Sequence, residues 1–169
     1  LPGGVPCAAP LRYEDAVRQA LLRFKFQGRS AAARPLGELI AQCAAEHFSG
    51  EFDTVAWVPV SRKRLRQRGY DQAELLARTA AGERGLPARR LLEKKTDNVP
   101  QSHLEDEAAR RANVQGAYRL TGEDLSGLRV LLVDDVVTTG STMGECARLL
   151  LEGGASEVWG LTLAQARKK

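Results

Sequence analysis

Cysteine, aromatic residues and long apolar runs are all scarce in this sequence. Its three cysteines stand far apart, at positions 7, 43 and 146, and no Cys-x-x-Cys pair occurs. This spacing argues against a disulfide framework or a structural zinc site, and it fits a reducing, cytoplasmic compartment. Aromatic residues make up 5% of the chain, which leaves few rings to stack on nucleic-acid bases.

No apolar run approaches the roughly 20 residues that a transmembrane helix needs. The longest candidate, residues 130–133, ends directly at Asp134 and Asp135. Hydrophobic residues nevertheless make up 43% of the 169 residues, enough for a folded core rather than a disordered chain. We therefore expect one globular domain over residues 1–169 without a membrane span.

Positive charge is concentrated in one short segment. The net charge is only +4, which by itself does not indicate a nucleic-acid partner. Within residues 62–68, however, five cations occur without an intervening acid: Arg62, Lys63, Arg64, Arg66 and Arg68. Because this segment follows an apolar run that ends at Pro59, we expect a basic turn at the end of a strand.

Apolar spacing predicts alternating helices and strands. Residues at helical intervals predict helices near 17–24, 35–43, 73–80 and 143–150. Continuous apolar or β-branched runs predict buried strands at 54–59, 128–134 and 158–163, with a brief strand around 91–92. The charged stretch 93–115 lacks an apolar stripe and is expected at the surface. The alternation predicts an α/β fold with a mainly parallel central sheet flanked by helices.

The segment from Val130 to Thr142 carries the strongest functional signal. An apolar strand leads into Asp134 and Asp135, which suit sugar hydroxyls and could hold Mg²⁺ through water. A turn rich in hydroxyls then opens a helix, whose N-terminal N–H groups and partial positive charge favour a phosphate. The residues predicted to bind that phosphate are Thr138, Thr139, Gly140, Ser141 and Thr142.

Simpler interpretations of this segment exist. Ser and Thr are common helix caps, so the hydroxyl cluster could serve only to start a helix. Paired acids after a strand also occur in receiver domains, but there the pair stands near the start of the domain rather than at 134–135. A Walker loop is excluded because Gly-x-x-x-x-Gly-Lys does not occur.

Residues 133–140, Val-Asp-Asp-Val-Val-Thr-Thr-Gly, closely resemble the phosphoribosyl pyrophosphate (PRPP) signature of type I phosphoribosyltransferases. The resemblance implies a fold of that type with a hood or flexible loop. It further implies that residues 138–142 bind the 5′-phosphate and that Asp134 and Asp135 bind the ribose. Thr138 stands where purine-salvage members often have an aspartate, so the resemblance does not imply a purine acceptor, and no catalytic residue is identified.

Two further segments gain a role from this resemblance. The turn after the first long apolar run would bind pyrophosphate through Val60, Ser61, Arg62 and Lys63. The stretch 93–115 would form the flexible loop over PRPP, where the candidate residues are Lys94, Lys95, Arg110 and Arg111. An ordinary charged connection with acids and bases paired at i,i+4 accounts for the same stretch equally well.

Four blocks together are similar to the ComF family of competence-associated proteins. They lie at residues 25–36, 59–77 and 100–118 and in the PRPP signature. The family more usually has Asn where Asp71 stands, and its full-length members usually carry an N-terminal zinc-binding segment with four cysteines, which these residues do not include. The resemblance implies a role in DNA uptake, with other competence proteins and single-stranded DNA as partners.

The sequence leaves two functions open. The first is Mg²⁺-dependent transfer of ribose 5-phosphate from PRPP with release of pyrophosphate. The second is binding without turnover, as a PRPP or nucleotide sensor or as an adaptor for single-stranded DNA. Such an adaptor would use a basic surface made of Arg62, Arg64, Arg66, Arg68 and Tyr70, for which a solvated basic face is the simple alternative. Neither function fixes the oligomeric state.

Overall fold

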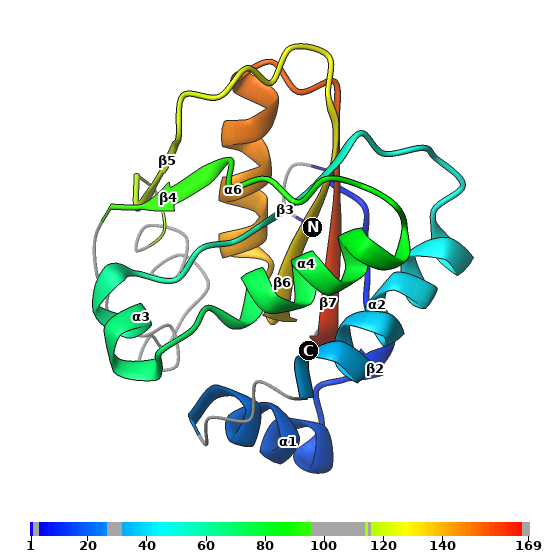
Figure 1. Cartoon of the computed structure of the whole chain (residues 1–169), viewed down its shortest axis with the longest axis vertical. Coiled ribbons are helices and arrows are strands. Elements are labelled where there is room, and N and C mark those ends of the chain that lie inside the picture. The colour runs from blue at the N-terminus through cyan, green and yellow to red at the C-terminus, as the bar shows by residue number, and fades with distance from the viewer. Residues whose placement is uncertain (2–3, 27–31, 96–113, 115, 167–169) are drawn as a thin grey trace.

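A parallel sheet runs through the centre of the molecule (Figure 1). The computed structural model describes residues 1, 4–26, 32–95, 114 and 116–166. The two long strands β6 (Arg129–Val137) and β7 (Glu157–Gln165) pair along their length, and β3 (Thr54–Trp57) pairs with β6 at one edge. The short strands β1 (Cys7–Ala8) and β2 (Leu11–Arg12) lie on the other side of β7. The predicted α/β fold with a mainly parallel sheet is confirmed.

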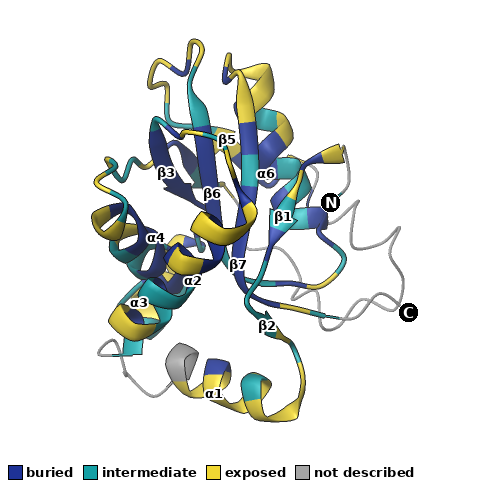
Figure 2. Ribbon diagram, turned by 90° about the vertical axis from the view of Figure 1, so that its right-hand side faces the viewer, coloured by how far each residue is buried: buried dark blue, intermediate teal, exposed yellow. Residues whose placement is uncertain are grey.

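Helices cover both faces of this sheet (Figure 2). Helices α2 (Ala33–His47) and α4 (Gln72–Glu83) lie on one face and α6 (Ser141–Glu152) lies on the other. Helix α1 (Asp15–Phe26) begins next to the carboxyl end of β7, where the Tyr13 N–H donates to the Gln165 carbonyl at 2.9 Å. Strands β4 (Leu92–Lys94) and β5 (Tyr118–Leu120) form a separate antiparallel pair.

The alternation of side chains along β6 builds two buried layers. Leu131 and Val133 pack with residues of α2 and α4, whereas Val130 and Leu132 pack with residues of α6. Because helices cover both faces, the strand is apolar at every position from 130 to 133. Within the described part of the chain, no helix is both long and apolar enough to cross a bilayer.

The prediction of a basic turn was wrong, because residues 62–68 form a helix, α3 (Arg62–Arg68). Ser61 caps its start by accepting the Arg64 N–H on its hydroxyl at 3.3 Å. Gly69 ends it in the left-handed region with φ 81°, and its N–H donates to the Leu65 carbonyl at 2.8 Å. A helix made almost entirely of cations has no apolar period, so only these two capping residues indicated it.

Strand β6 ends three residues later than predicted, at Val137 instead of Asp134. Its pairing with β7 continues to Val137, whereas its pairing with β3 stops at Val133. Asp134 and Asp135 therefore lie within β6 rather than after it, but they lie beyond its last partner in β3. Strands β1, β2 and β5 were not predicted, since two or three residues are too short to show a period.

Candidate functional site

The carboxyl ends of β3 and β6 lie side by side. Trp57 pairs with Val133, and the Val58 N–H donates to the Val133 carbonyl at 2.9 Å. The turn that follows β3 and the acidic residues that end β6 are therefore neighbours. Ligands of open parallel sheets bind beyond the carboxyl ends of the strands, so this edge is the candidate site.

The turn between β6 and α6 carries several hydroxyl groups and ends at Gly140. Gly140 adopts φ 81° and ψ 2° immediately before α6, and as the N-cap residue it has no side chain to occupy the first N–H groups of the helix. The Thr139 and Ser141 hydroxyls lie 2.8 Å apart, and Thr138 is exposed. Ser141 is buried, and Thr142 is half-buried in the first turn of α6. The Ser141 N–H donates to Thr139 Oγ1 at 3.4 Å. A helix N-terminus beside several hydroxyls is suited to a phosphate.

Asp134 and Asp135 point to opposite faces of β6, because neighbouring residues of a strand alternate. Both are half-exposed, and the Asp135 N–H donates to Asp134 Oδ1 at 2.8 Å. Asp134 lies toward α6: burial raises the pKa of Cys146 far above its usual value, and the Asp134 charge adds to that rise. Asp135 lies toward α3: burial lowers the pKa of Arg68, and the Asp135 charge opposes this.

Helix α3 presents two different cationic sides. Arg64 and Arg68, one turn apart, are half-buried, and Arg68 Nη1 donates to Gln72 Oε1 at 3.0 Å. Arg62, Lys63 and Arg66 are exposed. The five cations that the sequence grouped together are therefore divided between a side near the acidic pair and a side facing solvent.

Asp71 joins the turn after β3 to the start of α4, and it is not among the site residues predicted from the sequence. Its Oδ2 accepts the Val60 N–H at 2.9 Å, and its Oδ1 accepts the Ala73 and Glu74 N–H groups at 3.0 and 3.3 Å. Burial raises the pKa of Asp71 to about 6, although the three N–H groups favour its charged form. The Asp-x-x-Glu spacing of residues 71–74 is a capping signal, but it does not reveal the bond to Val60.

The β4–β5 pair carries a further cation, Lys94, near the carboxyl ends of β3 and β6. Lys94 Nζ lies 5.2 Å from the centre of the Tyr118 ring, and the Lys94 charge lowers the pKa of Cys146 against the larger effect of burial. Lys95 is exposed, and its N–H donates to the Ala117 carbonyl at 2.8 Å. Arg110 and Arg111 lie outside the described residues.

Buried Tyr118 lies where three of these elements converge. Burial raises its pKa well above the usual value, and the charges of Asp134, Arg64 and Asp71 also act on it. Tyr70, by contrast, is half-buried and packs against the core on the α2 and α4 face. No group of three or more His, Cys, Asp or Glu side chains in the described ranges could enclose a metal ion.

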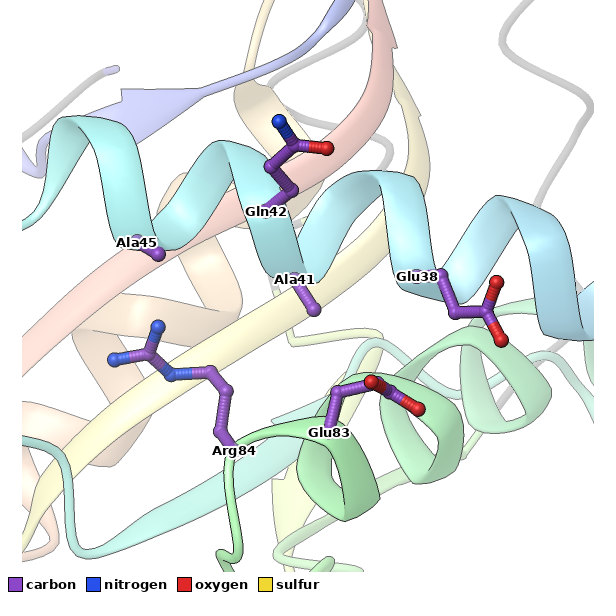
Figure 3. Close-up of a pocket in the computed structure, with 6 residues that line it drawn as sticks. All are labelled: Glu38, Ala41, Gln42, Ala45, Glu83 and Arg84. Carbon is purple, nitrogen blue, oxygen red and sulfur yellow. The ribbon is translucent and has the colours of Figure 1, made fainter.

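A separate pocket of about 600 Å³ lies between α2 and the C-terminal end of α4 (Figure 3). Figure 3 shows Arg84 at one end and the carboxyl groups of Glu38 and Glu83 at the other. The Arg84 guanidinium lies 5.7 Å from the centre of the Phe52 ring. None of the predicted site residues lines this pocket, so it is not part of the candidate site.

Comparisons with known proteins agree with the fold and the signature. Residues 88–169 match the phosphoribosyl transferase domain family. Part of glutamine PRPP amidotransferase from B. subtilis, solved with ADP and GMP, superimposes with a TM-score of 0.53 and 26% identity. That match covers 78% of this chain and 26% of the amidotransferase.

Two curated relatives are similar over most of the chain. Competence protein F from Haemophilus influenzae is 31% identical over 160 residues, covering 90% of this chain and 70% of the relative. DNA utilization protein YhgH from Salmonella typhimurium is 35% identical over 144 residues, covering 81% of this chain and 63% of the relative. The chain thus spans about two thirds of the length of these relatives. On this evidence the chain belongs to the ComF family of phosphoribosyltransferase-like proteins.

Proposed function

We propose that this protein binds PRPP at the carboxyl edge of its sheet and transfers the ribose 5-phosphate group, releasing pyrophosphate. One observation carries the proposal: the N-terminus of α6, the acidic pair of β6 and the half-buried cations of α3 lie around the ends of two adjacent strands. These groups match, in order, the phosphate, the ribose hydroxyls and the pyrophosphate of a single PRPP molecule.

Different residues would bind the 5′-phosphate, the ribose and the pyrophosphate of PRPP. The backbone of residues 138–142 would accept the 5′-phosphate, since Gly140 allows close approach and the helix end carries partial positive charge. Asp134 and Asp135 would accept hydrogen bonds from the ribose hydroxyls. The Val60–Ser61 turn, Arg64, Arg68 and Lys94 would bind pyrophosphate, because pairs of phosphoryl oxygens can accept two parallel hydrogen bonds from one guanidinium group.

The acidic pair also fits Mg²⁺, a cation that prefers oxygen ligands and usually keeps several waters. Among the described residues, no third His, Cys, Asp or Glu side chain joins these two half-exposed carboxylates as a metal ligand. They therefore suit an ion that is held mainly by pyrophosphate and water. When bound, Mg²⁺ would stabilise the negative charge that develops on the leaving group. In the transfer, the bond from ribose C1 to the pyrophosphate oxygen breaks, and pyrophosphate leaves with the electron pair. A bond from C1 to the acceptor forms, and the acceptor proton passes to solvent.

The test is an incubation with PRPP, Mg²⁺ and a panel of nucleobases and amines, with pyrophosphate release as the readout. Release that depends on one acceptor supports the transferase. Binding of PRPP without release for any acceptor, measured by calorimetry on the same sample, supports a non-catalytic sensor instead. The absence of PRPP binding overturns both.

A second function is favoured by the outer side of α3. Arg62, Lys63 and Arg66 are exposed beside Leu65, which is 41% exposed, and no acid interrupts them. Such a surface could contact the backbone of single-stranded DNA, and relatives are named for competence and DNA utilization. The chain would then act in DNA uptake as an adaptor. Measuring its binding to fluorescent oligonucleotides at several salt concentrations tests this function independently of PRPP.

A further inference from the structure

The single carboxylate of Asp71 connects two parts of the candidate site. One oxygen caps α4 through Ala73 and Glu74, and the other accepts the Val60 N–H in the turn that leads into α3. Asp71 is 6% exposed, so water cannot easily replace these bonds. The next residue, Gln72, accepts a hydrogen bond from Arg68, which ties the C-terminal end of α3 to the same point.

Only the ionised form of Asp71 suits this arrangement. A carboxylate accepts on both oxygens, whereas a protonated carboxyl or an Asn side chain carries a hydrogen donor on one side. If the remaining acceptor oxygen keeps its bonds to the Ala73 and Glu74 N–H groups of α4, the new donor faces the Val60 N–H. Two donors cannot form a hydrogen bond, so the bond to the turn is lost. Ser at this position would cap α4 but would be too short to bridge to Val60 as well.

The charge on Asp71 lowers stability while it holds the turn. Burial makes the folded protein bind the Asp71 proton more tightly than the unfolded chain does, with the pKa at about 6 instead of 3.8. The contribution of Asp71 to the free energy of unfolding is therefore largest below pH 4 and falls as the pH rises to 6. The described charged and titratable groups that act on Asp71 are Glu74 of α4, Arg68 of α3 and Tyr118 of β5.

We propose that the ionised carboxylate of Asp71 is the positioning group that holds the Val60–Ser61 turn in its ligand-binding form, so that PRPP binding weakens when Asp71 takes up a proton. This inference rests on the proposed function, because it concerns the pyrophosphate side of the same site. Asp71 acts through the turn rather than by touching the ligand. An Asn at this position would remove the dependence on protonation.

The experiment compares wild type, Asp71→Asn and Asp71→Ser by calorimetry with PRPP and Mg²⁺ between pH 5 and 8.5. The ratio of the dissociation constants of variant and wild type cancels the titration of the ligand phosphates, which is common to both. At pH 8 we expect both variants to bind about 10-fold more weakly, as for loss of one hydrogen bond to a charged group. Toward pH 5 the ratio should approach one.

Two further measurements distinguish positioning from a structural role. Asp71→Asn should melt at or above the wild-type temperature at pH 8, because it removes a buried charge. Its Val60 amide should exchange with solvent faster, as measured by NMR without ligand. Asp124→Asn is the matched control, because the Asp124 carboxylate also accepts a backbone N–H, from Ser126 at 2.9 Å, but lies in the loop before β6.

The outcomes separate this inference from the proposed function. If the ratio of the PRPP dissociation constants of variant and wild type is near one at pH 8, or does not change with pH, Asp71 is not the positioning group for this site. If the wild-type protein binds no PRPP at any pH, the proposed function is wrong. The rate of hydrogen exchange at the Val60 amide, compared between wild type and the Asp71 variants, then decides whether Asp71 holds the turn. Unchanged exchange in both Asp71 variants overturns the inference in that case too.

Discussion

Gly37 of α2 lies directly against Thr79 of α4. A Cβ atom added to Gly37 would come within 2.4 Å of Thr79 Cβ and 2.6 Å of Thr79 Cγ2. Neither atom is the end of a long flexible side chain, so the clash cannot be relieved by a rotation. The absence of a side chain at Gly37 therefore sets how closely the two helices pack, and α4 is the helix whose N-terminus carries Asp71.

Gly37→Ala should destabilise the protein by about 1–3 kcal/mol, because overpacking a helix contact costs more than alanine gains in helix propensity. For a chain of this length, that lowers the melting temperature by about 2–4 °C per kcal/mol. The matched control is Gly82→Ala in α4, where an added Cβ meets nothing within 4 Å. That variant should gain about 0.5–1 kcal/mol. Equal effects of the two substitutions in a thermal melt would contradict this account.

Gly140→Ala tests the phosphate-binding turn. Alanine in the left-handed region costs about 1–2 kcal/mol and places a Cβ beside the start of α6. We expect a lower melting temperature and a smaller rise in that temperature on adding PRPP with Mg²⁺. Gly127→Ala carries the same backbone strain, with φ 71°, at the other end of β6. Gly127→Ala should lose a similar amount of stability, but PRPP with Mg²⁺ should raise its melting temperature as much as that of the wild type. If this rise is reduced in Gly127→Ala as well, backbone strain alone explains the behaviour of Gly140→Ala.

The two sides of α3 should separate two binding activities. Arg62→Ala with Arg66→Ala removes exposed charges, so it should weaken binding of single-stranded DNA and reduce the salt slope by about 0.7 per lost phosphate contact. Arg64→Ala with Arg68→Ala should instead weaken PRPP binding, because these side chains lie near the acidic pair. Fluorescence anisotropy with an oligonucleotide and calorimetry with PRPP measure the two effects. If the outer pair leaves the salt slope unchanged, that side is only a solvated face.

The sequence predicted the long elements well because their signals are local. The apolar run of β6 and the cluster Thr138 to Thr142 are contiguous, and each carries its own period or cap. What the sequence could not supply is contact between distant residues. The bond between Asp71 and Val60, the close approach of Gly37 and Thr79, and the position of Lys94 over Tyr118 all depend on tertiary packing.

The division of charged residues between faces was also beyond the sequence. In the sequence, five cations within seven residues form one cluster. In the helix, Arg64 and Arg68 lie on one half-buried side, whereas Arg62 and Arg66 are exposed. In the same way, Asp134 and Asp135 are neighbours in the chain, yet a strand directs them to opposite faces. Periodicity could predict these directions only once the type of each element was known.

Replacing Asp134 and Asp135 by Asn tests the centre of the proposed function. Both side chains are half-exposed near the carboxyl end of β6 and belong to neither buried layer. The double variant should therefore fold and melt close to the wild-type temperature. Loss of a hydrogen bond from a ribose hydroxyl to a charged acceptor costs about 1.5–3 kcal/mol, or about 10- to 150-fold in affinity per residue. The variant should therefore lose most of the stabilisation that PRPP with Mg²⁺ confers.

The matched control for this pair is Glu123→Gln with Asp124→Asn, two adjacent acids in the loop that precedes β6. It removes the same charge at the opposite end of the strand and should leave the PRPP effect intact. The single variants extend the test, because Asp135 neighbours Arg68 whereas Asp134 lies toward α6. Full stabilisation of the double variant by PRPP would mean that the ligand binds elsewhere. Failure of the double variant to fold would mean that the acidic pair is structural, because carboxylates that only bind ligand are not needed to complete the sheet.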